Sequence, residues 1–197
     1  MKTTRTIGFT SSFDVLELLG RFEARRAAVG VVGLGSMGIG RATEFAEKGF
    51  DVRGIDADEG RVEILRLGEL EIAGTAAARA AACVEAGKLR FSSQFADLAD
   101  CDAIVVCSSA LVRRTRELDT HALITGMDRI VPVTRAAQCL VLESRSPPGT
   151  TRGVVLPRIE ERGFAVGKDP FLAFSPERIR HTSSRLDPRT RRASWAA

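Results

Sequence analysis

The chain has 197 residues, of which 44% are hydrophobic and 27% charged, and its formal net charge is +4. This composition is typical of a globular protein, and the length allows a sizeable core. No apolar run approaches the roughly 20 residues of a membrane-spanning helix, and the N-terminus lacks the apolar segment of a secretory signal, so we expect a cytoplasmic protein without membrane contacts.

The first predicted element is an amphipathic helix between Ser11 and Ala28. Ser11 and Asp14 have the spacing of a helix-capping start. The apolar stripe consists of Phe13, Val15, Leu16, Leu18, Leu19 and Phe22. Because this helix precedes the first strand, residues 1–28 are interpreted as an N-terminal helical extension that packs against the sheet edge or a partner subunit.

The next segment, VGVVGLGSMG, is a β-branched run that ends in the pattern G-x-G-x-x-G. In a dinucleotide-binding loop Gly33 permits the tight turn, Gly35 lets a pyrophosphate approach the backbone, and Gly38 lets the following helix pack closely. That helix begins near Met37 and would present its N–H groups and positive dipole end to the phosphates. The predicted cofactor-binding residues of the loop are Gly33, Leu34, Gly35, Ser36, Met37 and Gly38.

A second strand, Phe50–Ile55, ends at Asp56, which lies 23 residues after Gly33. A dinucleotide-binding fold places the carboxylate that holds the adenosine ribose at about this distance. The loop alone is a weak signal, because a generic glycine-rich turn can have the same letters. Together, the loop and the acid favour a nucleotide-binding Rossmann unit with NAD as its cofactor.

Helices and strands alternate through the rest of the chain. Helices are predicted at residues 61–65, 75–86, 121–130 and 153–162, and strands at residues 89–91, 103–107, 139–142 and 171–174. The continuous apolar run Ala103–Cys107 is typical of a parallel strand that is covered on both faces. This alternation predicts an α/β fold with a doubly wound, Rossmann-type parallel sheet.

The cysteines do not have metal-binding spacing. Cys83, Cys101, Cys107 and Cys139 form no C-x-x-C pair, and the chain has only two histidines, so we expect no metal site. Cys107 ends an apolar run and Cys139 begins one, and both are interpreted as buried core thiols.

The C-terminus carries the positive charge of the chain. Residues 178–197 contain six arginines and one acid, so the remaining residues have a net charge of about −1. A basic tail can bind nucleic acid, but a solvated end is the more common case, and we expect no nucleic-acid partner. Residues 180–197 have few apolar anchors and are predicted to form a disordered basic tail.

Three stretches occur in a fixed order: GLGSMG with the strand that ends at Asp56, LVLESRSPPGTT from Leu140, and DPFLAFSPERI from Asp169. Together with the leading helix they resemble the N-terminal half of the UDP-glucose/GDP-mannose dehydrogenase family, and most closely the bacterial UDP-N-acetyl-hexosamine 6-dehydrogenases. The resemblance covers about residues 12–179. Its E-S-x-x-x-P-G-T-T and F-S-P-E-R motifs are far more specific than the glycine loop.

The resemblance implies NAD-dependent oxidation of a sugar 6-hydroxyl to a carboxylate, through intermediates bound to a cysteine. It implies that the glycine loop binds the cofactor together with Asp56, Arg61, Cys107, Ser108, Ala110 and Glu143. Glu177 stands where the family has a carboxylate that helps water attack the thioester. Without the resemblance, Glu177 is better explained as a turn residue that pairs with Arg178.

The chain also departs from the family pattern. Cys107-Ser-Ser-Ala110-Leu replaces C-V-P-T-P, and Arg145 replaces a threonine tied to catalysis. The match stops after Ile179, before the substrate domain and the nucleophilic cysteine. We therefore expect residues 29–179 to be the NAD-binding domain of a nucleotide-sugar 6-dehydrogenase that is truncated and inactive alone, with a UDP-sugar bound only if a second domain is supplied.

Two alternatives remain open. The chain could be a non-catalytic nucleotide-binding or partner-docking fragment of a shortened gene, which forms a homo-oligomer or docks on a full-length relative through its first helix. The loop GLGSMG also occurs in β-hydroxyacid dehydrogenases, but that family does not explain the other two motifs.

Overall fold

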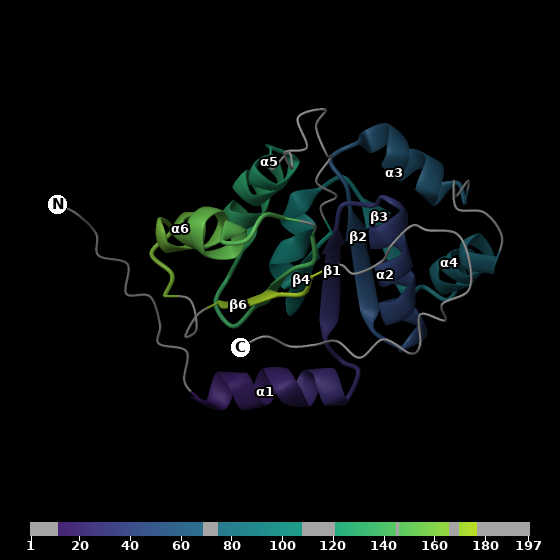
Figure 1. The fold of residues 1–197 in the computed structure, drawn as a ribbon. Helices are drawn as coiled ribbons and strands as arrows, with labels where there is room; N and C mark the ends of the chain where they lie inside the picture. Colours follow the sequence, from purple (N-terminus) through teal and green to yellow (C-terminus); the bar gives the residue numbers. More distant parts are fainter. Residues whose placement is uncertain (1–11, 69–74, 108–120, 145, 166–169, 177–197) are drawn as a thin grey trace.

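The computed structural model describes residues 12–68, 75–107, 121–144, 146–165 and 170–176. In this part of the chain a six-stranded sheet lies at the centre (Figure 1). Its strands are β1 (Ala28–Val32), β2 (Asp51–Ile55), β3 (Leu89–Ser92), β4 (Ala103–Val106), β5 (Cys139–Leu142) and β6 (Phe171–Phe174). They are all parallel, in the order β3-β2-β1-β4-β5-β6, which confirms the predicted doubly wound α/β fold of Rossmann type.

The described helices occur between the strands and before the first of them. They are α1 (Ser12–Glu23), α2 (Ser36–Glu47), α3 (Glu59–Arg66), α4 (Thr75–Glu85), α5 (His121–Ile130) and α6 (Leu156–Glu160). Short 3-10 helices span Phe95–Asp100 and Val131–Val133, and a π-helical turn, Thr151–Val155, leads into α6.

Helices cover both faces of the sheet. Successive side chains of each strand point to opposite faces, so one strand contributes to the core on both sides. Val105 of β4 belongs to a buried cluster that contains Ile39 of α2. Its neighbours Ile104 and Val106 belong to a second buried cluster, which contains Met127 of α5. The core therefore has two layers of apolar side chains, one on each side of the sheet.

β1 and β4 are neighbours in the sheet, but the chain leaves them in opposite directions. After β1 it forms α2 and returns as β2 on one side. After β4 it forms α5 and returns as β5 on the other side. Such a divergence opens a crevice at the carboxyl ends of the two strands, where open α/β sheets bind their ligands.

Two predicted helices differ from their observed bounds by three or more residues at one end. α1 ends at Glu23 rather than near Ala28, because Arg25 adopts a left-handed backbone conformation with φ of 57° and the chain turns toward β1. The predicted helix 153–162 begins within the π-helical turn and continues as α6, in whose first turn Pro157 has no N–H to donate.

One cysteine is also less buried than predicted. Cys107 is buried, but Cys139 is only half-buried. Leu140 and Leu142 of β5 point into the cluster beneath α5, whereas Cys139 and Val141 are on the opposite face, which the described residues cover only in part. Cys139 is therefore not the buried core thiol that its place in an apolar run predicted.

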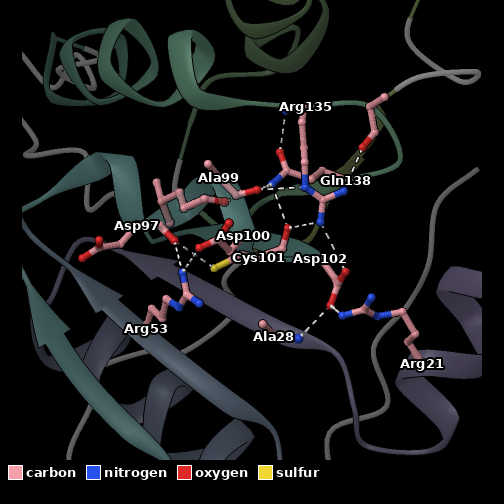
Figure 2. A network of polar contacts seen from close by, with 12 residues as sticks. Arg21, Ala28, Arg53, Asp97, Ala99, Asp100, Cys101, Asp102, Arg135 and Gln138 are labelled. Atoms are coloured by element: carbon pink, nitrogen blue, oxygen red, sulfur yellow. Dashed lines mark hydrogen bonds and ion pairs between the residues drawn. The ribbon is translucent and has the colours of Figure 1, made fainter. Parts of the chain in front are cut away.

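α1 is joined to the sheet through the buried side chain of Asp102, immediately before β4 (Figure 2). Asp102 Oδ2 accepts hydrogen bonds from Arg21 of α1 and from the N–H of Ala28 in β1, both at 2.8 Å. Arg135 donates to Oδ1 of the same carboxylate at 3.4 Å. The helical extension thus packs on the amino ends of β1 and β4, at the opposite end of the sheet from the crevice.

No helix within the described residues is long and apolar enough to cross a membrane. The predicted disordered tail, residues 180–197, lies outside the described residues. The same is true of residues 1–11, the beginning of the predicted helical extension.

Candidate functional site

A cavity of about 610 Å³ lies at the carboxyl ends of β1 and β4. Val32 and Gly33 border it where β1 ends, and Val106 and Cys107 border it where β4 ends. The remaining wall comes from the glycine loop, from residues 56–58 after β2, from Arg61 and Phe95, and from one side of α5. The cavity therefore occupies the crevice that the strand order creates.

Gly33 and Gly38 let the loop fold tightly against β4. Gly33 has φ of +92°, and a Cβ atom there would lie 2.3 Å from the carbonyl oxygen of Cys107. A Cβ atom on Gly38 would lie 1.8 Å from the carbonyl oxygen of Gly33. Both distances are far below van der Waals contact, so a larger residue would push these segments apart.

Gly35 has a different role, because a Cβ atom added there meets no neighbouring described atom within 4 Å. The residue lines the cavity and is the N-cap of α2, where it offers no side chain to the N–H groups of the first turn. The first-turn N–H groups and the positive dipole end of α2 therefore lie at the cavity wall. A pyrophosphate fits such a site, since it needs close approach to the backbone and N–H donors.

Asp56 is held beside the glycine loop by two main-chain hydrogen bonds. Its Oδ2 accepts from the N–H of Leu34 at 2.7 Å, and its Oδ1 accepts from the N–H of Asp58 at 3.0 Å. A carboxylate has about four acceptor positions, so Asp56 can still accept hydrogen bonds from ribose hydroxyls. Leu34 takes part through its main chain, because its side chain is buried in the core.

Arg61 lies in the first turn of α3 and lines the cavity together with Asp56. Its N–H donates to Oδ1 of Asp58, the N-cap of the helix, at 3.0 Å. Its Nη1 lies 3.5 Å from the carbonyl oxygen of Leu34. The structure therefore brings the predicted loop, Asp56 and Arg61 together at one end of the cavity.

The other predicted site residues fall into two groups, those that the structure places and those that lie outside the described residues. Cys107 borders the cavity and is buried. Ser108, Ala110 and Glu177 lie outside the described residues, as does Arg145. Within the described part of the chain, no group of three or more His, Cys, Asp or Glu side chains could hold a metal ion.

Glu143 follows β5 and is paired with Arg41 of α2. Arg41 Nη2 is 2.6 Å from Oε1 of Glu143, and Nε donates to the same oxygen at 2.8 Å. Burial alone would lower the pKa of Arg41, but the hydrogen bonds and charges of Glu143 and Glu44 together outweigh this effect, and the pKa of Arg41 is raised. Glu143 does not line the cavity, and its predicted contact with the cofactor stays a prediction.

Sequence reasoning missed the wall that α5 and Phe95 supply. Ala122, Thr125, Gly126 and Arg129 line the cavity with the i, i+3, i+4, i+7 spacing of one helix face. The guanidinium carbon of Arg129 lies 4.0 Å from the centre of the Phe95 ring. The spacing is visible in the sequence, but small residues and one arginine are equally typical of a helix face in water.

Comparisons with known proteins agree with this geometry. A family model described as the UDP-glucose/GDP-mannose dehydrogenase family, NAD binding domain, matches residues 27–190. The UDP-N-acetyl-D-glucosamine 6-dehydrogenase of Pseudomonas aeruginosa is 33% identical over 152 residues, which are 77% of this chain and 35% of that protein.

Solved structures show the same similarity. A UDP-D-ManNAc dehydrogenase from Pyrococcus horikoshii has a TM-score of 0.73 at 25% identity, over 78% of this chain and 37% of that chain. An NDP-N-acetyl-D-galactosaminuronic acid dehydrogenase from Methanosarcina mazei Go1 has a TM-score of 0.73 at 28% identity, over 83% and 37% of the two chains.

The chain spans about a third of the length of these relatives. The region matched by the family model includes all six strands, the glycine loop and Asp56. The family predicted from the sequence motifs is thereby confirmed, with NAD as the cofactor of the matched domain. The chain belongs to the UDP-glucose/GDP-mannose dehydrogenase family and corresponds to its NAD-binding domain.

Proposed function

We propose that the cavity at the carboxyl ends of β1 and β4 is the NAD site of a nucleotide-sugar 6-dehydrogenase. The observation that carries the proposal is the placement of Asp56 against the glycine loop. Asp56 is fixed by the N–H of Leu34 at 2.7 Å, and the adjacent Gly35 opens the backbone to the cavity. A carboxylate and an uncapped helix start, side by side, match the ribose and the pyrophosphate of a dinucleotide.

Each part of the wall has its own task in this proposal. The first-turn N–H groups of α2 hold the pyrophosphate. Asp56 accepts hydrogen bonds from the adenosine ribose, and its negative charge disfavours the 2′-phosphate of NADP. Arg61 and Cys107 border the cavity on either side of the loop. NAD, when bound, supplies the hydride acceptor.

The substrate class is inferred from the relatives. Their names include UDP-N-acetyl-D-glucosamine 6-dehydrogenase and UDP-N-acetyl-D-mannosamine dehydrogenase. We infer that the full-length protein oxidises the 6-hydroxyl of a UDP-sugar to a carboxylate, and that Glu177 assists hydrolysis of a cysteine-bound thioester. Sugar binding and the nucleophile would come from the part of the relatives that this chain does not match.

Calorimetric titration of the chain with NAD and with NADP tests the cofactor site. We expect NAD to bind more tightly than NADP. Asp56→Ala should weaken NAD binding about tenfold, because hydrogen bonds to a charged group contribute about 1.5–3 kcal/mol. Asp56→Asn removes the charge but keeps an oxygen that can accept the N–H of Leu34. Comparing the two variants therefore separates the loss of charge from a change in loop geometry.

Asp128→Ala is the matched control, since Asp128 lies on α5, pairs with Arg158 at 3.0 Å and does not line the cavity. This variant should bind NAD as the unmodified chain does. Equal or tighter binding of NADP, or NAD binding that is unchanged in both Asp56 variants, would contradict the proposed site.

A further inference from the structure

Arg129 is placed between an aromatic ring and the cavity. Its guanidinium carbon lies 4.0 Å from the centre of the Phe95 ring. Phe95 is buried, with 7% of its surface exposed, whereas Arg129 is exposed and lines the cavity. The ring therefore supports the guanidinium from the core side.

Arg129 has no carboxylate partner within the part of the chain that the structure describes. Other arginines are neutralised by acids: Arg158 pairs with Asp128 at 3.0 Å, and Arg41 pairs with Glu143 at 2.6 Å. A guanidinium held only by a ring keeps its charge and its flat outer face for a ligand. Its flat face suits an aromatic ring, and the N–H groups at its edge suit an anion.

The position of Phe95 along the sheet decides between these two ligands. The N–H of Asp56 donates to the carbonyl oxygen of Ser92 at 3.2 Å, so the ends of β2 and β3 are adjacent. Phe95 begins the 3-10 helix soon after Ser92, whereas the glycine loop follows β1. From the glycine loop outward, the wall therefore runs through Asp56 to Phe95 and Arg129.

We propose that Arg129 stacks its guanidinium on the adenine ring of the dinucleotide, with Phe95 as its support. The inference rests on the proposed NAD site, in which the loop holds the pyrophosphate and Asp56 holds the adenosine ribose. Adenine then lies beyond Asp56, on the side away from the loop. A planar guanidinium stacks well on aromatic rings, and a lysine ammonium does not.

ADP-ribose is the probe for this role, because it contains the adenine, both riboses and the pyrophosphate without the nicotinamide. It is titrated calorimetrically into the chain and into Arg129→Lys and Arg129→Leu, at low and high salt. Both variants should bind about fivefold more weakly, at the lower end of what a stacked base contributes. A parallel titration with the fluorescent ethenoadenine form should show a smaller fluorescence change in both variants, because that signal reports stacking of the ring.

Arg158→Lys is the control, since Arg158 is an arginine outside the cavity. Thermal unfolding of each variant without ligand shows whether the fold is retained. If Arg129→Lys binds like the unmodified chain while Arg129→Leu does not, Arg129 contacts a phosphate and the stacking role is wrong. Unchanged binding in both variants also overturns it, whereas a folded, unmodified chain that does not bind ADP-ribose overturns the NAD site itself.

Discussion

The carboxylate of Asp102 and the guanidinium of Arg21 are 2.8 Å apart and join residues that are separated by 81 positions in the sequence. The same carboxylate oxygen accepts the N–H of Ala28 at 2.8 Å, so Asp102 holds both α1 and the start of β1. The family match begins at residue 27, after this helix. α1 is nevertheless part of the hydrogen-bonded framework of the domain.

Asp102→Ala should lower the free energy of unfolding by about 2–4 kcal/mol, because the N–H of Ala28 and the guanidinium of Arg21 lose a buried acceptor. Arg21→Leu should cost only about 1 kcal/mol, since Arg21 is half-exposed and Asp102 keeps its other donors. Urea unfolding measures both. Arg90→Leu removes an exposed pair with Asp51 and serves as the control; an Asp102→Ala variant as stable as this control would contradict the anchoring role.

Gly35→Ala and Gly40→Ala form a matched pair of substitutions. In both positions the new Cβ meets no neighbouring described atom within 4 Å, so both proteins should fold. Gly40 lies in α2 and is exposed, and alanine there should stabilise the helix by about 1 kcal/mol without affecting NAD binding. Alanine at Gly35 should weaken NAD binding, because the methyl group occupies the space at the uncapped start of α2.

Gly38→Ala should affect the stability of the fold rather than NAD binding alone. Its Cβ would lie 1.8 Å from the carbonyl oxygen of Gly33, so the loop must move and the protein should lose stability before any ligand is added. Thermal unfolding and NAD titration of the three glycine variants separate the two effects. Equal NAD affinity of the Gly35 and Gly40 variants would show that the loop does not hold the pyrophosphate.

Burial raises the pKa of the Cys101 thiol to about 11, from an ordinary value near 9. As the pH rises, the thiol therefore loses its proton in the unfolded chain before it does so in the folded protein. The stability that the protonated Cys101 contributes to folding is fully present below about pH 9 and is lost as the pH rises through about 11. The loss for this one group is about 2–3 kcal/mol. The chain contains no tyrosine, which would otherwise titrate in the same range.

Urea unfolding between pH 8 and pH 11 measures this dependence. Cys101→Ala should be less stable at neutral pH, because it leaves a small cavity, but its stability should fall less steeply toward alkaline pH. Part of the pH dependence of the unfolding free energy should remain in this variant, because burial also raises the pKa of Cys83 and of Cys139. Parallel curves for the variant and the unmodified chain would show that Cys101 titrates normally in the folded protein.

The strands and the glycine loop could be predicted because their signals are local. Ala103–Val106 is a short apolar run, and its neighbours in sequence suffice to identify it as a buried parallel strand. The loop and Asp56 follow a spacing fixed by one βαβ unit. α5 was likewise expected at His121–Ile130, because its apolar residues repeat with a helical period.

The contacts that complete the site could not be predicted, because they join distant parts of the chain. Arg41 meets Glu143 across 102 positions, and the neighbours of neither residue in the sequence identify the other as its partner. Arg129 and Phe95 meet because α5 and the segment after β3 pack together, which only the strand order reveals. The end of α1 was also missed, because a non-glycine residue, Arg25, adopts the left-handed conformation there.

The isolated chain of 197 residues should not oxidise nucleotide sugars. The proposed reaction needs a thiolate that is positioned and activated to trap an aldehyde. Cys107 is the cysteine that borders the cavity, but it directly follows the buried strand β4 and is only 5% exposed. Burial raises the pKa of Cys83, Cys101 and Cys139, which keeps them protonated. In the proposed function the nucleophile and the sugar-binding wall belong to the part of the relatives that this chain does not match, and a reaction without such positioned groups loses about 7–11 kcal/mol of barrier lowering.

The measurement is NADH formation by the purified chain with a panel of UDP- and GDP-sugars, in the absence of any full-length relative. Prior titration with NAD establishes that the cofactor site is occupied, so a lack of turnover reports on the chemistry and not on cofactor binding. We expect NAD binding without NADH formation, in the chain and in Cys107→Ser alike. Sustained NADH formation that Cys107→Ser abolishes would instead make Cys107 the nucleophile and this domain an enzyme without a second domain, because the reacting thiol would then lie inside the cofactor cavity itself.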